Sequence, residues 1–232
     1  MADIDTTGSV FALFDLDGTL CNARYLASDL IGYQFKKSAR IPNAIIYSIK
    51  QAVRLLLWKT GFWTYARTVQ GSASEIARLL KGLNKNEVSI LFSKSAKKTV
   101  NSAREDIINL LIWHKEEGHT IIVMSGGFQP FLEEVAKLLG VNHIIGTAIE
   151  EVDGYYTGRL IGPLCHGEDR VHLVRSFIEE SGFDVNLSSS YAYGDRAQDI
   201  PILEMVGHPV AVYPDKELLT YANERGWTVI GA

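Results

Sequence analysis

The sequence predicts an α/β fold in which a doubly wound parallel sheet carries an inserted bundle of helices. An apolar run, residues 11–14, ends in two aspartates; helical periodicity then fills about eighty residues; and from residue 103 helices and strands alternate. Such alternation is typical of a parallel sheet with right-handed crossovers. We therefore predict a core of residues 1–21 and 101–232 and a helical insert of residues 22–100.

Composition and charge also indicate two parts. The chain has 232 residues, 47% of them hydrophobic, enough for a core domain with an insert. Residues 21–100 hold 14 Lys or Arg against three acidic residues, a net charge of +11. The rest of the chain holds nine Lys or Arg against 24 acidic residues, a net charge of −15, and the two parts together give −4 for the whole chain. A basic and an acidic part suggest two domains with different surfaces.

Cysteine content and hydropathy favour a cytoplasmic protein. Cys21 and Cys165 are too few for a disulfide framework, which suggests a reducing compartment. Residues 1–9 include Asp3 and Asp5 and lack the basic and apolar regions of a signal peptide, and no run approaches the length of a membrane span. No nucleic-acid partner is expected, and the sequence does not indicate an oligomeric state.

The insert is predicted from helical spacing and from residues that begin helices. Pro42 suits a first turn, and apolar residues then recur at helical spacing. Gly61 interrupts the pattern. The expected helices are 44–59, then 75–80 capped by Ser72 or Ser74, then 87–98 capped by Asn84 or Asn86.

The core is predicted from helices that end at glycine and from short apolar runs between them. Asp153-Gly154, flanked by alternating polar and apolar residues, indicates a hairpin. The expected elements are helix 104–117, strand 119–124, helix 131–139, strand 143–147, hairpin 151–159, helix 169–180, strand 189–193, helix 199–205, strand 209–213, helix 216–224 and strand 227–230.

Two carboxylates stand at the end of the first strand, where open α/β sheets bind ligands. Asp15 and Asp17 have the same parity, so an extended strand would point both to one side. Crowded carboxylates repel each other, and a divalent cation relieves the repulsion. For an isolated pair, a polar strand end with a turn would be the better interpretation.

The longer string Asp15-Leu-Asp-Gly-Thr-Leu20 resembles the first motif of the haloacid dehalogenase superfamily of phosphotransferases. The order of the later motifs, with an insert after the first, resembles its phosphoserine-phosphatase-like branch, subfamily IB, which has a C1-type helical cap. This resemblance implies that Asp15 is the nucleophile and that Asp17 is the general acid and base. It also implies a Rossmann-like core and an insert that covers the site.

Two further motifs complete the resemblance. Ser125 and Gly126 follow an apolar strand and precede a helix, where backbone amides attract anions, and they look like the family's phosphate-binding motif. Asp195 and Asp199 match its last acidic motif. The implied cofactor is Mg²⁺, held by Asp15, Asp195 and the backbone carbonyl of Asp17, with Asp199 supporting the site.

The third motif departs from the family pattern, which has Lys. Arg170 stands in the place of that Lys and keeps its positive charge, but a guanidinium differs in geometry from an ammonium. Arg159 and Arg196 are the alternatives for this role. A further interpretation of Arg170 is a solvated charge at the start of a helix. Arg24 replaces the Glu that contacts the substrate's amino group in phosphoserine phosphatases. A cation at this position would repel an ammonium group, so we expect it to affect substrate selection.

The remaining motifs carry less chemistry. The six histidines show no close metal-ligand spacing, so we expect surface or partly buried side chains. Basic and aromatic residues of the insert, such as Lys59 and Trp58, indicate either a solvated face or a membrane-surface patch.

The resemblance implies a magnesium-dependent phosphatase of a small phosphorylated metabolite. A phosphatase of a membrane lipid phosphate and a phosphoserine phosphatase are the alternatives. A binding module without catalysis is disfavoured, because both aspartates of the first motif, Ser125 and Asp195 are present.

Overall fold

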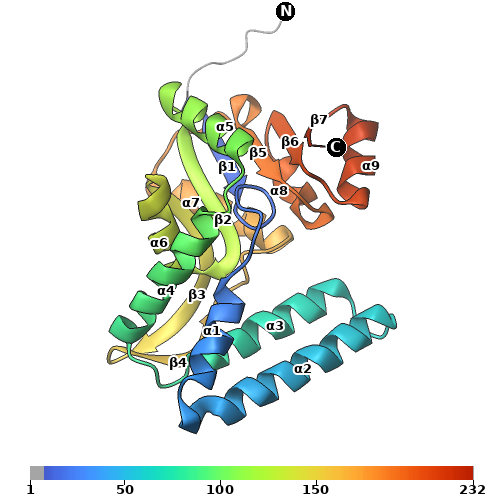
Figure 1. Cartoon of the computed structure of the whole chain (residues 1–232). Helices are drawn as coiled ribbons and strands as arrows, with labels where there is room; N and C mark the ends of the chain where they lie inside the picture. The colour runs from blue at the N-terminus through green and yellow to red at the C-terminus, as the bar shows by residue number, and fades with distance from the viewer. Residues whose placement is uncertain (1–7, 232) are drawn as a thin grey trace, which may run out of the picture.

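The computed structural model describes residues 8–231, apart from the side chains of residues 65 and 66. The prediction about a signal peptide concerns the segment before residue 8 and lies outside these residues. The described strands form one sheet in the order β4-β3-β2-β1-β5-β6-β7 (Figure 1). The strands are β1 Phe11–Asp15, β2 Thr120–Phe128, β3 His143–Val152, β4 Tyr155–Ile161, β5 Tyr191–Gly194, β6 His208–Val212 and β7 Thr228–Ile230.

All neighbouring strands are parallel except β3 and β4, which form an antiparallel hairpin at the edge. The predicted doubly wound parallel sheet is therefore confirmed.

The described helices are α1 Leu26–Phe35, α2 Ile41–Lys59, α3 Tyr65–Leu79, α4 Lys85–Val100, α5 Glu105–Glu116, α6 Gln129–Leu139, α7 Glu168–Ser181, α8 Ile200–Leu203 and α9 Lys216–Arg225.

The central strand β1 is buried along its whole length because both faces of the sheet are covered. Its alternate side chains enter two hydrophobic clusters. Phe14 packs on one face with residues of α4, α5 and α6, and its ring stacks on Tyr193 with centroids 4.3 Å apart. Leu13 packs on the other face with residues of α7, α8 and α9. This burial fixes the position of the aspartate that ends β1.

The start of α3 differs from the prediction. A single helix runs from Tyr65, and Thr64 caps it by accepting a hydrogen bond from the backbone N–H of Arg67. The prediction that Ser72 or Ser74 caps a shorter helix is wrong, because both lie inside α3. Their hydroxyl groups instead donate to the Gln51 side chain and to the backbone carbonyl of Gln70. The predicted Asn84 cap of α4 is confirmed.

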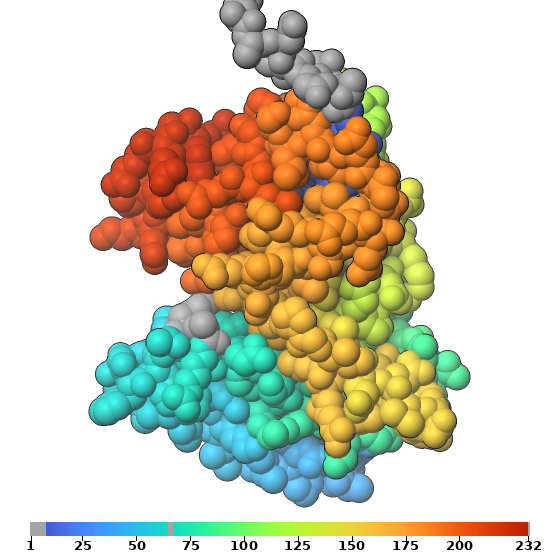
Figure 2. Space-filling model, turned by 180° about the vertical axis from the view of Figure 1, so that it is seen from behind, coloured from blue at the N-terminus to red at the C-terminus, as the bar shows by residue number. Residues whose placement is uncertain are grey.

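The four inserted helices occupy two places. Helix α4 lies along α6 of the core, where Phe92 meets the rings of Phe128 and Phe131 at centroid distances of 6.4 and 6.2 Å. Helices α1, α2 and α3 lie below the sheet in Figure 1, and the same segment forms the lower part of the molecule from behind in Figure 2. The hydrophobic cluster is continuous between them. The domain division at residues 22 and 100 stays a prediction.

The chain enters and leaves the insert at one point. Cys21 and Ala103 form an isolated antiparallel bridge. On either side of it, the backbone N–H of Asn22 donates to the carbonyl of Ser102, and that of Arg104 donates to Leu20. The two connections are therefore tied to each other beside the end of β1.

Among the described helices, none combines the length and the hydropathy that crossing a membrane requires.

Candidate active site

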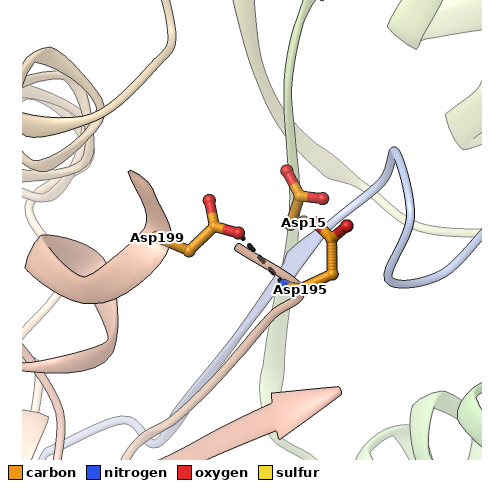
Figure 3. A group of neighbouring side chains, drawn as sticks. All are labelled: Asp15, Asp195 and Asp199. Carbon is orange, nitrogen blue, oxygen red and sulfur yellow. Dashed lines mark hydrogen bonds between the residues drawn. The ribbon is translucent and has the colours of Figure 1, made fainter. Parts of the chain in front are cut away.

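Three carboxylates meet at the carboxyl ends of the two central strands β1 and β5. Asp15 is the last residue of β1, Asp195 follows β5, and Asp199 lies in the short turn before α8. A carboxylate oxygen of each lies within 4.8 Å of the others (Figure 3). The backbone N–H of Asp195 donates to Asp199 at 3.1 Å and fixes that side chain. The three side chains are buried, so their charges are poorly screened.

This cluster fits a divalent cation. Burial raises the pKa of Asp15 well above its usual range, Arg170 opposes the shift, and the neighbouring aspartates add to it. Burial, followed by the charge of Asp199, raises the pKa of Asp195 to about 6. Oxygen ligands of high charge density are those that Mg²⁺ prefers, and a cation would relieve the repulsion.

Gly18 allows the loop after β1 to lie against Asp195. Its φ of +110° belongs to a region that other residues rarely adopt. A Cβ atom at this position would lie 2.1 Å from Asp195 Oδ2. The absence of a side chain thus permits the close approach of two loops that carry site residues.

Arg170, in the first turn of α7, lies directly beside the cluster. Its Nη2 atom lies 2.9 Å from Asp15 Oδ1 and its Nη1 atom lies 2.6 Å from Asp199 Oδ1. Burial alone would lower the pKa of Arg170, but the charges of Asp15 and Asp199 outweigh burial and raise it. The guanidinium is therefore a permanent charge between two buried carboxylates, and it leaves the other oxygen of Asp15 unoccupied.

The alternative arginines lie in different surroundings. Arg159 Nη1 is 3.8 Å from Glu150 on the hairpin, and its side chain is 78% exposed. Arg196 Nε is 3.3 Å from Asp195 Oδ2, and its side chain is 41% exposed. Arg170, by contrast, contacts both Asp15 and Asp199, so the geometry favours it for the role that Lys has in the third motif.

Ser125 and Asp17 form a second pair at the site. The hydroxyl of buried Ser125 donates to Asp17 Oδ2 at 2.6 Å and accepts from the backbone N–H of Gly127 at 2.9 Å. Gly126 lines a cavity that Asp15 and Asp17 also line. These residues lie in the irregular end of β2, and α6 begins only at Gln129. The expectation that they stand at a helix N-terminus is therefore wrong, because β2 continues past them to Phe128.

Arg24 reaches over the first motif from the connection to α1. Its Nη2 atom donates to the backbone carbonyl of Asp17 at 2.6 Å, and its Nε atom lies 3.9 Å from Asp17 Oδ1. This carbonyl is the one that the family resemblance assigns to the metal. The side chain of Arg24 is 52% exposed, so it stands at the mouth of the cavity and not inside it.

A cavity of about 320 Å³ joins these groups to the inserted helices. Among the described residues, the only carboxylates that line it are Asp15, Asp17, Asp195 and Asp199. Sequence reasoning missed the polar residues Thr99, His166 and Gln198, which no motif marks. The apolar part of the wall consists of Tyr25, Leu26, Ala27, Val69, Ala73, Ile76, Phe128, Phe131 and Leu164.

Comparison with known proteins gives a consistent picture. A sequence model of the family "haloacid dehalogenase-like hydrolase" matches residues 12–204. The phosphoserine phosphatase SerB1 of Mycobacterium tuberculosis is 37% identical over 116 residues, covering 50% of this chain and 37% of that protein. The histidinol-phosphatase of Neisseria meningitidis serogroup C is 35% identical over 119 residues, covering 50% and 54%. The chain thus spans about a third to a half of the length of these curated relatives.

Solved structures share the whole fold. A protein of unknown function from Bordetella pertussis has a TM-score of 0.81 and 26% identity, covering 97% of this chain and 99% of that one. A phosphoserine phosphatase in its apo form has a TM-score of 0.62 and 20% identity, covering 97% and 94%. Both alignments run over nearly the entire chain, the segment of α1 to α4 included.

Proposed function

The chain belongs to the haloacid dehalogenase-like hydrolases, and we propose that it is a magnesium-dependent phosphatase that hydrolyses a small phosphorylated metabolite through an aspartyl-phosphate intermediate. One observation supports this above the others: Asp15 Oδ2 is buried without a partner in a cavity that also holds a buried cation, Arg170. An unpaired carboxylate oxygen in such surroundings is suited to attack phosphorus.

The proposed first step transfers the phosphoryl group to Asp15. Its Oδ2 atom attacks phosphorus in line, the bond from phosphorus to the ester oxygen breaks, and Asp17 gives a proton to the leaving oxygen. Arg170 holds the other oxygen of Asp15, so the nucleophile has one orientation. Ser125 holds Asp17 through its hydroxyl and contributes, with the Gly126 amide, to binding the phosphoryl oxygens.

The proposed second step regenerates the enzyme. Asp17 takes a proton from a water molecule, which attacks phosphorus and releases inorganic phosphate from Asp15. Asp15, Asp195, Asp199 and the Asp17 carbonyl would hold Mg²⁺, which supplies positive charge against the transferring phosphoryl oxygens. Arg24 would give up its contact with that carbonyl when the cation binds.

The cavity favours a substrate without an amino group. Among the described residues that line it, no carboxylate exists beyond the four of the site, so an ammonium group would lack a partner. Arg24 at the mouth would repel it. The wall offered by α1 and α3 is largely apolar. These features support an ester with a neutral, apolar or anionic alcohol part and disfavour phosphoserine.

The helices α1, α2 and α3, within the predicted insert of residues 22–100, act in this proposal as a cap. Val69 and Ile76 of α3 and Leu26 of α1 line the same cavity as the catalytic carboxylates. Closure of such a cap excludes water and selects the substrate. A cytoplasmic location stays a prediction.

The proposal is tested by phosphate release from p-nitrophenyl phosphate with added Mg²⁺. We expect turnover by the unaltered chain and a fall of about a thousandfold or more in kcat for Asp15→Asn, because the nucleophile is lost. Asp169→Asn, which changes an exposed carboxylate next to Arg170, is the matched control and should keep full activity. Undiminished turnover by Asp15→Asn would falsify the mechanism.

A screen of phosphorylated amino acids, sugars, nucleotides and lysophospholipids then ranks substrates by kcat/KM. Esters without an amino group should rank above phosphoserine. The reverse order would contradict the role given to Arg24.

A further inference from the structure

Helix α2 presents an apolar face to solvent. At the helical spacing of 100° per residue, five of its aliphatic residues lie within one stripe. Each is about half exposed or more, although aliphatic residues at this spacing normally pack into a core. The stripe, here named the α2 face, consists of Ile45 (47% exposed), Ile46 (50%), Ile49 (59%), Val53 (50%) and Leu56 (61%).

The opposite side of α2 carries polar groups toward α3. Glu75 of α3 is 7% exposed and pairs with Lys50 at 3.1 Å and with Arg54 at 3.5 Å. Gln51 accepts a hydrogen bond from Ser72 at 2.8 Å. Ala44 and Tyr47 of α2 are also buried toward the other helices. The helix therefore has an inner side that is already packed, and it carries aliphatic side chains on its outer side as well, where a helix on a soluble surface carries polar residues, so the α2 face is built to be covered by another apolar body.

Charge identifies what covers it. Residues 30–74 contain seven Lys or Arg and no Asp or Glu. Along the chain, an exposed aromatic residue adjoins a lysine on both sides of the α2 face: Phe35 with Lys36 at the end of α1, and Trp58 with Lys59 at the end of α2. Both lysines are exposed, and within the described part of the chain neither forms an ion pair. Phe62, in the turn after α2, is 79% exposed. Aliphatic residues between bases and aromatics are typical of helices that lie in a membrane interface.

We propose that the α2 face docks, with the helix parallel to the surface, on a bilayer that contains anionic lipids. Its aliphatic side chains would enter the boundary of the acyl chains while the lysines contact the headgroups. A second copy of the chain fits the face less well. Two copies would bring together two segments that lack acidic residues, and like charges would repel.

Docking leaves the catalytic cavity open. No α2 residue is among the described residues that line it. In Figure 1, α2 lies at the lower edge of the molecule with α3 between it and the sheet. The proposal therefore does not depend on the phosphatase reaction, and membrane binding can be measured without a substrate.

The test is flotation of the full chain with vesicles of equal parts phosphatidylglycerol and phosphatidylcholine, compared with phosphatidylcholine alone. We expect binding to the anionic vesicles that falls about tenfold or more from roughly 0.1 to 1 M NaCl. The double variant Ile49→Asp with Leu56→Asp should lose binding by a similar factor, because charges replace the centre of the face. Ile90→Asp, at a 73% exposed position on α4, is the matched control and should bind as the unaltered chain does.

Circular dichroism and sedimentation velocity complete the test. Unchanged spectra and melting in all variants show that loss of flotation reflects the face and not the fold. The proposal is overturned if the unaltered chain stays away from anionic vesicles, or if Ile90→Asp loses binding equally. It is also overturned if the unaltered chain sediments as a dimer that the double variant dissociates, because the face then joins two copies.

Discussion

Arg170 is a buried cation that contacts two carboxylates, Asp15 at the end of β1 and Asp199 in the turn before α8. The sequence predicted its role only through the resemblance of its surroundings, because an arginine near a helix start is usually solvated. The sequence could not show that Asp15 and Asp199 contact the two terminal nitrogens of Arg170. Asp15 lies 155 positions before Arg170 in the chain, and Asp199 lies 29 positions after it. Their contact depends on the sheet order.

Replacing Arg170 tests this arrangement. We expect Arg170→Ala to lower kcat by about a hundredfold and to destabilise the fold by about 3 kcal/mol, because two buried carboxylates lose their counterion. Arg170→Lys should retain part of the activity, since an ammonium keeps the charge but cannot grip both carboxylates as a fork. Phosphate release and urea unfolding measure the two effects.

Arg159→Ala is the matched control, because this arginine is exposed at the hairpin. A larger loss in Arg159→Ala than in Arg170→Ala would move the role to the hairpin.

His114 is a residue whose environment the sequence did not reveal. It is fully buried: Nε2 lies 2.7 Å from the Tyr193 hydroxyl and Nδ1 lies 2.7 Å from His119 Nδ1. The prediction of surface or partly buried histidines is wrong for His114. Tyr193 lies 79 positions away in β5, so the sequence alone does not show that it meets His114.

His114 gives the fold a pH dependence. Burial, followed by the neighbouring His119, lowers the pKa of His114 to about 4 from an ordinary value of 6.5. Because the folded pKa lies below the unfolded one, its contribution to stability is complete above pH 6.5 and is lost as the pH falls toward 4. The shift corresponds to about 3 kcal/mol.

Urea unfolding at pH 7 and pH 4.5 should show a smaller difference for His114→Gln than for the unaltered chain. Exposed His172→Gln is the control. Equal differences in all three proteins would show that His114 does not carry the effect.

At the scale of elements, helix caps and strand ends separate what the sequence can predict from what it cannot. Asn84 and Gly140 follow local rules, so α4 and the end of α6 were predicted. The start of α3 was not predicted, because the local sequence makes Ser72 and Ser74 equally plausible caps. In the fold, Ser72 instead donates to Gln51 of α2 from inside the helix, and Thr64 provides the cap.

The loop after β1 yields a prediction of its own. Gly18→Ala should destabilise the fold by about 2 kcal/mol and weaken cation binding, because the added Cβ would strain the backbone and displace Asp195. Gly118→Ala is the control, since Gly118 also has a positive φ but open space around it. Calorimetry with Mg²⁺ separates the effects: both variants should lose stability, and only Gly18→Ala should lose affinity.

At the scale of the whole molecule, the alternation of strands and helices was enough to predict the sheet. The position of α4 was not predictable, because its helical periodicity does not state which partner it covers. Phe92 is buried against α6, so α4 contacts the core although it lies within the predicted insert. Long-range packing of this kind leaves no signature in a single sequence.

The stability of the entire fold should depend on a divalent cation. Because Asp15, Asp195 and Asp199 repel one another in the folded state, a bound cation stabilises that state. At about a hundred times its dissociation constant, Mg²⁺ should add about 2.7 kcal/mol. Thermal melts in MgCl₂ and in NaCl of equal ionic strength measure the gain. Asp195→Asn should reduce it strongly, and identical melts of the unaltered chain in both salts would contradict the metal site.

The bridge between Cys21 and Ala103 has a consequence for how this fold can change. The chain leaves the core at Cys21 and re-enters it at Ala103, which are neighbours in space. The distance between these two positions of the core is therefore short whatever segment lies between them in the sequence. The entropy of closing such a loop grows only with the logarithm of its length. The segment between these positions can therefore be lengthened, shortened or exchanged with little cost to the core, while Asp15, Asp195 and Asp199 lie outside the segment that changes.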